Sequence, residues 1–152
     1  MSAGKYLTFA LDREEYAVPV LKVREIIKIM DITKVPQLPP YVKGVINLRG
    51  KVVPIVDMRM KFGLPASEYA ERTCIIVVEV AARNSVVMMG VIVDSVSDVL
   101  NISMDEVGSP PNFGGSKESG WVEALATVKG HVKIVLNLDK MLGTDGELIR
   151  AA

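Results

Sequence analysis

Two runs of β-branched and aliphatic residues near the middle of the chain constrain its fold most. Residues 73–80 and 85–93 are each long enough for one strand, and the four residues between them fit a reversal. They predict an antiparallel strand pair. Most other apolar segments are also short and are separated by Gly or Pro, of which the 152 residues contain 12 and 8. This punctuation is typical of many short strands, so the sequence predicts a mainly β protein.

The segments before this pair predict a hairpin followed by a helix. Residues 5–11 alternate between two faces, and the polar stretch 12–15 turns the chain into a second strand at 16–20. From Val20 to Met30, apolar residues recur every three or four positions, with charged residues between them. This spacing predicts a short amphipathic helix.

A glycine-bounded segment comes next. Gly44 and Gly50 bracket a short apolar stretch that ends in Arg49. A continuous apolar strand is expected over 51–58, and a helical turn over 58–63.

The C-terminal part of the chain predicts further strands. Residues 96–102 form a third strand after the central pair, and 108–120 is a Gly- and Ser-rich loop. Residues 121–128 and 131–138 are expected to form a hairpin, after which Asp139 caps a final helical turn.

The similarity of residues 53–60 and 135–141 suggests a duplicated barrel unit. We expect a single domain over 1–152, with one lobe at about 12–71, a second at about 72–138, and terminal segments that pack across the lobes. A domain of this size can bury roughly 70% of its unfolded surface, so two lobes can share one core.

Charge and composition narrow the function. Eighteen Lys and Arg balance eighteen Asp and Glu, so the chain lacks the net field that concentrates nucleic acid. A small β-barrel that binds nucleic acid remains the alternative, through a local basic patch. No signal peptide or membrane-spanning run is expected, which favours a cytoplasmic protein.

Catalytic and metal-binding signals are weak. Cys74 lies in an apolar run and reads as a small buried residue, and His131 reads as an exposed turn residue. The chain holds no Cys-x-x-Cys, no His-x-x-x-His and no phosphate-loop order of Gly, Lys and Ser or Thr. We therefore expect no catalytic residue, no metal and no cofactor. Eight Met and an apolar fraction of 49% suit adaptable surfaces that bind other proteins.

Five motifs in one order carry a family resemblance. They are Val18-Pro-Val-Leu-Lys-Val-Arg-Glu-Ile-Ile27, Val35-Pro36, Gly44-Val-Ile-Asn-Leu-Arg-Gly50, Val53-Pro-Ile-Val-Asp-Met-Arg-Met-Lys-Phe62 and Gly90-Val-Ile-Val-Asp-Ser-Val-Ser-Asp-Val-Leu100. Over about residues 5 to 143, the chain resembles the CheW family of bacterial chemotaxis coupling proteins.

The resemblance implies two five-stranded SH3-like β-barrels around a shared hydrophobic core, with short helices. It also implies a non-catalytic, cytoplasmic scaffold that couples chemoreceptor tips to the histidine kinase CheA in membrane-associated arrays. In such a scaffold, a groove between the barrels takes the receptor tip and other surfaces bind the CheA regulatory domain. Pseudo-equivalent contacts of that kind can close rings.

The same resemblance assigns site residues. Val23, Glu25, Arg49 and Val99 match positions linked with receptor binding, and Gly44 matches one linked with kinase binding.

Structural roles remain open for four of these residues. Arg49 and Glu25 can be a fold-stabilising ion pair or direct contacts, Val23 can be core or contact, and Gly44 can serve only its turn. Trp121, at the start of the last hairpin, departs from the family pattern. Related coupling proteins also serve pilus motility, development and second-messenger control, so the pathway stays open too.

Overall fold

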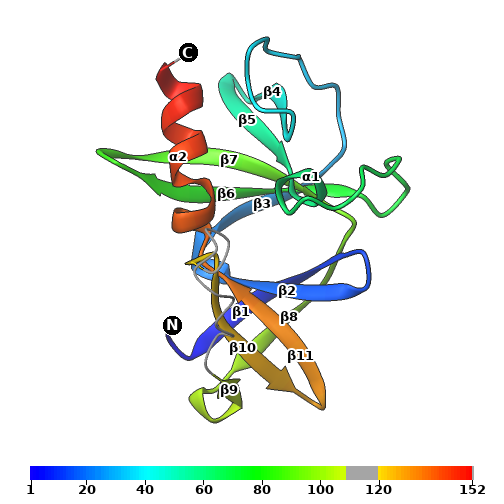
Figure 1. The fold of residues 1–152 in the computed structure, drawn as a ribbon, viewed down its shortest axis with the longest axis vertical. Coiled ribbons are helices and arrows are strands. Elements are labelled where there is room, and N and C mark those ends of the chain that lie inside the picture. The colour runs from blue at the N-terminus through cyan, green and yellow to red at the C-terminus, as the bar shows by residue number, and fades with distance from the viewer. Residues whose placement is uncertain (109–119, 152) are drawn as a thin grey trace.

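The protein is built from two β-sheets, described here in a computed structural model for residues 1–108 and 120–151 (Figure 1). The six-stranded sheet has the order β8 (Ser95–Ile102), β1 (Gly4–Leu11), β2 (Glu14–Pro19), β11 (His131–Leu136), β10 (Val122–Val128) and β9 (Val107–Gly108). The five-stranded sheet has the order β3 (Val23–Lys28), β6 (Cys74–Ala82), β7 (Ser85–Val93), β5 (Lys51–Asp57) and β4 (Val42–Leu48). Three short helical turns connect successive strands: η1 (Val20–Lys22), α1 (Met58–Lys61) and η2 (Met104–Glu106). Helix α2 (Leu138–Ala151) ends the described chain. The predicted mainly β fold with two barrel lobes is confirmed, with β9 added to one lobe.

The sheets do not follow the lobe boundary that the sequence suggested near residue 71. The lower lobe in Figure 1 combines the N-terminal strands β1 and β2 with β8 to β11, and the upper lobe contains β3 to β7. Strand β6 follows residue 71 in the sequence, yet it pairs with β3, which precedes that residue. Both faces of β6 are buried. Ile75 and Val77 face the interior of the upper lobe, whereas Ile76 and Val78 face the core between the lobes. A strand buried on both faces belongs in the middle of a sheet, where β6 lies between β3 and β7.

The predicted duplication is visible in the strand order. In both sheets, the order β8-β1-β2-β11-β10 or β3-β6-β7-β5-β4 repeats two antiparallel pairs, one parallel pair and one antiparallel pair. Strand β3 therefore corresponds to β8, and the β4–β5 hairpin corresponds to β10–β11. In the lower lobe, the N-terminal strands β1 and β2 occupy the places that β6 and β7 occupy in the upper lobe. The repeat is therefore permuted along the chain.

The two corresponding hairpins share one turn geometry. Arg49 and Gly50 have φ values of 51° and 85°, and Lys129 and Gly130 have 52° and 81°. Two successive positive φ values are the mark of a type I′ turn, whose twist matches that of the flanking strands. The similarity of residues 53–60 and 135–141 thus reports a repeated hairpin followed by a helix.

The helix predicted for residues 20–30 is wrong. Only η1 is helical there, and Val23 to Lys28 form β3, paired with β6. The segment is rich in Val and Ile, which lose side-chain freedom in a helix and pack well on a pleated strand. Burial accordingly alternates along β3 with a period of two.

Three clusters of buried apolar side chains lie within the described part of the chain. The largest lies between the sheets and includes Phe9 of the lower lobe, Ile76 of the upper lobe and Leu142 of α2. Two smaller clusters, around Ala126 and around Ile55, fill the two barrels. The expected shared core is therefore present.

Helix α2 leaves the lower lobe and packs on the upper one, beside β6 and β7 (Figure 1). The sequence predicted Asp139 as the cap of this helix, and this prediction is wrong. The Asn137 side chain accepts a hydrogen bond from the Lys140 backbone N–H at 3.1 Å, and Asp139 lies inside the first turn. Most of the loop predicted over 108–120 lies outside the described residues.

Candidate partner-binding surface

Arg49 and Glu25 lie together, as the sequence motif suggested. The Arg49 guanidinium donates from Nη2 to Glu25 Oε2, joining the β4–β5 turn to β3. The Arg49 side chain is 72% exposed, so most of its donor groups still face solvent. The turn geometry holds Arg49 in a left-handed conformation, and Gly50 N–H donates to the Asn47 side chain at 2.9 Å to close the turn.

Three charged residues of the η1–β3 segment are paired with other elements. Lys22 Nζ lies 2.7 Å from Asp139 of α2, and Arg24 pairs with Glu79 of β6. Together with Glu25, these residues tie the η1–β3 segment to three different parts of the protein. The segment is therefore an anchored edge strand.

Apolar side chains are exposed beside these ion pairs. Leu21 in η1 is 91% exposed, and Ile26 on β3 is also exposed. Val23, by contrast, is half-buried and packs against the shared core. The structure thus gives Val23 a core contact, and Leu21 and Ile26 are the open apolar side chains that sequence reasoning missed.

Val99 lies in the other lobe, on β8, and is 51% exposed. Its place corresponds to that of Ile26. In each sheet, the edge strand pairs with the second strand across a bulge. Asp98 follows the bulge of β8 and Glu25 follows the bulge of β3, so the next residues along the two strands match. Each lobe therefore presents an exposed apolar side chain at the same position of its edge strand.

Gly44 serves a tight backbone contact. Its φ is 138°, and a Cβ placed there would lie 2.0 Å from the Thr33 carbonyl oxygen. That oxygen accepts a hydrogen bond from Val45 N–H at 2.9 Å, and Thr33 N–H donates to Val45 oxygen at the same distance. Thr33 and Val45 thus form an isolated antiparallel bridge.

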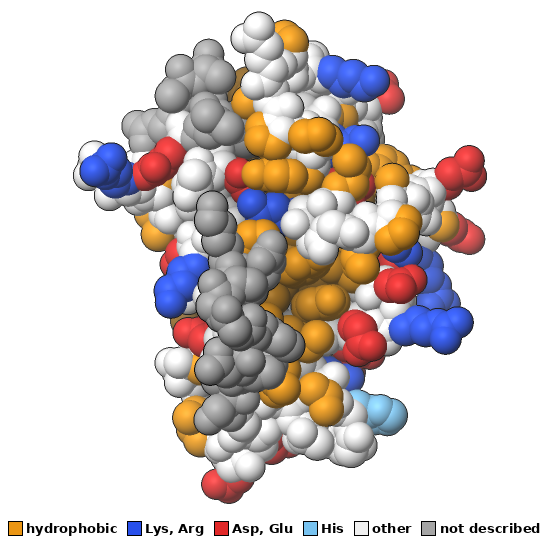
Figure 2. All heavy atoms as spheres, viewed as in Figure 1, with side chains coloured by type: hydrophobic (Ala, Val, Ile, Leu, Met, Phe, Trp, Pro, Cys, Tyr) orange, Lys and Arg blue, Asp and Glu red, His pale blue; other side chains and the backbone are white. Residues whose placement is uncertain are grey.

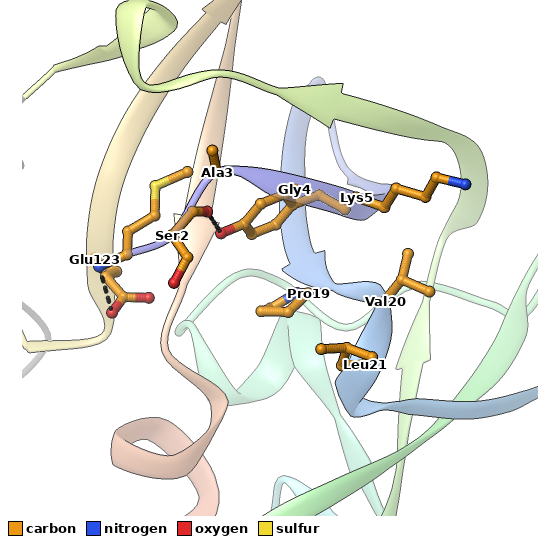
Figure 3. Close-up of a pocket in the computed structure, with 10 residues that line it drawn as sticks. Ser2, Ala3, Gly4, Lys5, Pro19, Val20, Leu21 and Glu123 are labelled. Atoms are coloured by element: carbon orange, nitrogen blue, oxygen red, sulfur yellow. Dashed lines mark hydrogen bonds and ion pairs between the residues drawn. The ribbon is translucent and has the colours of Figure 1, made fainter.

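An open cavity of about 550 Å³ lies beside η1 (Figure 3). Its lining is shared between the N-terminal segment, the η1 turn and β10: Met1, Ser2, Ala3, Gly4, Lys5, Tyr6, Pro19, Val20, Leu21 and Glu123. One wall is held by Tyr6, whose hydroxyl donates to the Ser2 oxygen at 2.6 Å. Burial raises the pKa of this hydroxyl, which keeps it a neutral donor.

A buried charged pair joins α1 to α2. Lys61 Nζ lies 2.8 Å from Asp145 Oδ2, and their side chains are only 9% and 5% exposed. Tyr41 donates its hydroxyl to Asp145 Oδ1 at 2.6 Å, and burial together with this carboxylate raises the pKa of Tyr41. Lys61 also lies over the rings of Tyr41 and Trp121. Trp121, the residue that departs from the family pattern, packs on Phe62 of the upper lobe and so helps to join the lobes.

The remaining reactive side chains are placed as expected. Cys74 is half-buried against the shared core, and burial raises the pKa of its thiol. His131 is exposed at the start of β11. No group of three His, Cys, Asp or Glu side chains in residues 1–108 and 120–147 is close enough to hold a metal ion. Nor is any helix of the described chain both long and apolar enough to cross a bilayer.

Apolar side chains gather on one face of the molecule, where the two lobes meet (Figure 2).

The chain also resembles known proteins. The chain matches the description "CheW-like domain" over residues 5–145. It belongs to the CheW family.

Individual relatives agree with this membership. The chain is 33% identical to the chemotaxis protein CheW of Klebsiella aerogenes over 141 residues, covering 93% of this chain and 82% of the relative. It is also 33% identical to the chemotaxis protein CheW of Rhizobium meliloti over 152 residues, covering 95% and 96%. The solved structure of the scaffolding protein TtCheW from Thermoanaerobacter tengcongensis aligns with a TM-score of 0.83 and 30% identity over 95% of each chain.

Proposed function

We propose that this CheW-family protein is a non-catalytic adaptor that couples the cytoplasmic tips of chemoreceptors to the regulatory domain of the kinase CheA. The observation that supports the proposal most is the family match over almost the whole chain, together with relatives named as chemotaxis proteins. The protein acts in the cytoplasm and is recruited to membrane receptor arrays by its partners.

The surface around η1 and β3 fits the receptor end of this role. Receptor tips are helical, and a helix binds a groove through a few apolar anchors flanked by polar contacts. Leu21 and Ile26 offer exposed apolar anchors, and the largely exposed guanidinium of Arg49, which pairs with Glu25 of β3, offers polar contacts. Val99 offers a further apolar anchor on the other lobe, and Val23 supports the strand from the core side.

The kinase end of the role involves the β4–β5 region, where we place Gly44. Since the lobes repeat one topology, two related surfaces are available for two partners. Head-to-tail contacts between such surfaces would allow the adaptor and the kinase to alternate in a ring.

The test is direct binding of each partner. Isothermal titration of the chain with a cognate receptor signalling fragment, and separately with the cognate CheA regulatory domain, should give saturable binding to both. Binding to neither cognate partner by a chain that melts cooperatively would reject the proposal.

A further inference from the structure

We propose that Asp139 is a positioning residue for the η1 turn, and through it for the receptor-binding surface. One carboxylate oxygen, Asp139 Oδ1, accepts from Lys22 Nζ at 2.7 Å and from the Ala81 backbone N–H at 2.8 Å. It therefore joins η1, β6 and the first turn of α2 at a single point.

The η1 turn has few other polar attachments. It has no capping hydrogen bond from a side chain, and none of its three residues is fully buried. Val20 packs against the shared core on one side, while Leu21 projects into solvent. Within the described chain, the Lys22–Asp139 pair is the one side-chain hydrogen bond that η1 makes. Packing on the shared core restrains the turn at Val20, sheet pairing holds the flanking residues Pro19 and Val23, and the pair with Asp139 fixes the side chain of Lys22.

The position of η1 matters because two features of the surface depend on it. Pro19, Val20 and Leu21 form one wall of the cavity beside the N-terminal segment (Figure 3). Directly after Lys22 the chain enters β3, which carries Glu25 and Ile26. A shift of η1 would move the wall and the start of the strand together.

Asp139 is itself well held without Lys22. It follows the capped start of α2, where a negative charge is favourable next to the free backbone N–H groups. Its bond to Ala81 fixes the carboxylate against β6. Lys22 can thus be released while Asp139 stays in place, which makes the two residues separable by mutation.

The two informative variants are Asp139→Asn and Lys22→Gln. The asparagine keeps an oxygen that can accept from Ala81 N–H, but it loses the charge that holds Lys22. Both variants should melt close to the unmodified chain. The matched control is Glu79→Gln, which breaks the Arg24 ion pair on β3 and leaves η1 attached.

The first readout is amide hydrogen exchange of Leu21, Lys22 and Val23 in the unbound protein. Both variants should raise these exchange rates about two- to fivefold, the range expected for a partly exposed ion pair. The double variant should add little, because each single change already breaks the same bond. Glu79→Gln should leave the η1 rates unchanged. Unchanged η1 rates in Asp139→Asn and Lys22→Gln would overturn the proposal.

The second readout rests on the proposed function. Affinity for the receptor signalling fragment should fall in Asp139→Asn and Lys22→Gln by about the same two- to fivefold as the exchange rates rise. Faster exchange with unchanged affinity would overturn the link to binding. If the unmodified chain does not bind the fragment, the proposed function fails, and the exchange rates still decide whether Asp139 positions η1.

Discussion

Arg49 and Glu25 connect opposite edges of one five-stranded sheet. Glu25 lies on β3, the first strand in the sheet order, and Arg49 lies in the turn beside β4, the last. Their ion pair helps to close the upper lobe into a barrel. The corresponding residues of the lower lobe, Asp98 and Lys129, form no such pair in the described structure, and Asp98 Oδ1 accepts from the neighbouring Val99 N–H. The two lobes therefore share a topology and carry the same charge signs at these positions, but in the described structure only the upper lobe joins the two residues in an ion pair.

Arg49→Ala should weaken receptor binding and barely change stability. Arg49 is largely exposed, and exposed ion pairs contribute only about 0.2–1 kcal/mol. Loss of a central arginine contact typically weakens an interface by about tenfold or more. Titration with the receptor fragment, alongside urea denaturation, measures both effects. Arg24→Ala, which also removes an exposed ion pair from β3, is the control and should retain affinity. Equal affinities for the two variants would make the Arg49 pair structural only.

Gly44→Ala should unfold the β4 edge, and its effect on kinase binding should follow from lost stability. An added Cβ would clash with the Thr33 oxygen at 2.0 Å and would also require a strained backbone, for a loss of about 3 kcal/mol. Gly130→Ala shares the positive φ but meets no atom within 4 Å, so it should lose only about 1 kcal/mol. Urea unfolding compares the two. A Gly44→Ala chain that is fully stable yet fails to bind CheA would instead make Gly44 a contact.

Asp145→Ala should destabilise the protein strongly. It would leave Lys61 buried without its counter-ion and Tyr41 without its acceptor, and breaking a buried pair from one side costs about 3–5 kcal/mol. Replacing both charges, in Lys61→Met with Asp145→Leu, should destabilise less than Asp145→Ala alone. Chemical denaturation of the three chains decides this. A single variant as stable as the unmodified chain would show that α2 is not held by this pair.

Stability should fall in alkaline solution as Tyr41 ionises. Burial and the Asp145 carboxylate raise the pKa of Tyr41 in the folded protein, whereas an unfolded tyrosine has a pKa of about 10. The folded state therefore holds the proton more tightly. Its contribution is complete below about pH 10 and is lost as the pH rises toward the raised value. Unfolding free energy measured from pH 8 to 11 should fall less steeply in Tyr41→Phe. Parallel profiles for the two chains would contradict this account.

Local pairing was predictable from the sequence, and long-range pairing was not. The turns at Asn84 and Gly130 lie between β-branched runs, and both hairpins are present as predicted. The parallel contacts of β5 with β7 and of β2 with β11 join segments far apart in the chain and leave no local signal. The lobe boundary was wrong for this reason.

The site was only partly predictable. The motif brought Glu25 and Arg49 together correctly, although Glu25 lies on a strand and not on the expected helix. The apolar spacing of three to four residues wrongly predicted a helix in this segment, because its β-branched residues favour a strand. The exposure of Leu21 and the contact of Asp139 with Ala81 depend on tertiary packing, which no local sequence pattern reports.

An adaptor of the proposed kind makes the activity of the kinase depend on the state of the receptor. The most direct measurement is CheA autophosphorylation in the presence of cognate receptors in membrane discs, with and without the chain, and with and without receptor ligand. Kinase activity should respond to the ligand only when the chain is added, and Arg49→Ala should weaken the response. Kinase activity that is the same with and without the folded chain, under both ligand conditions, would contradict it.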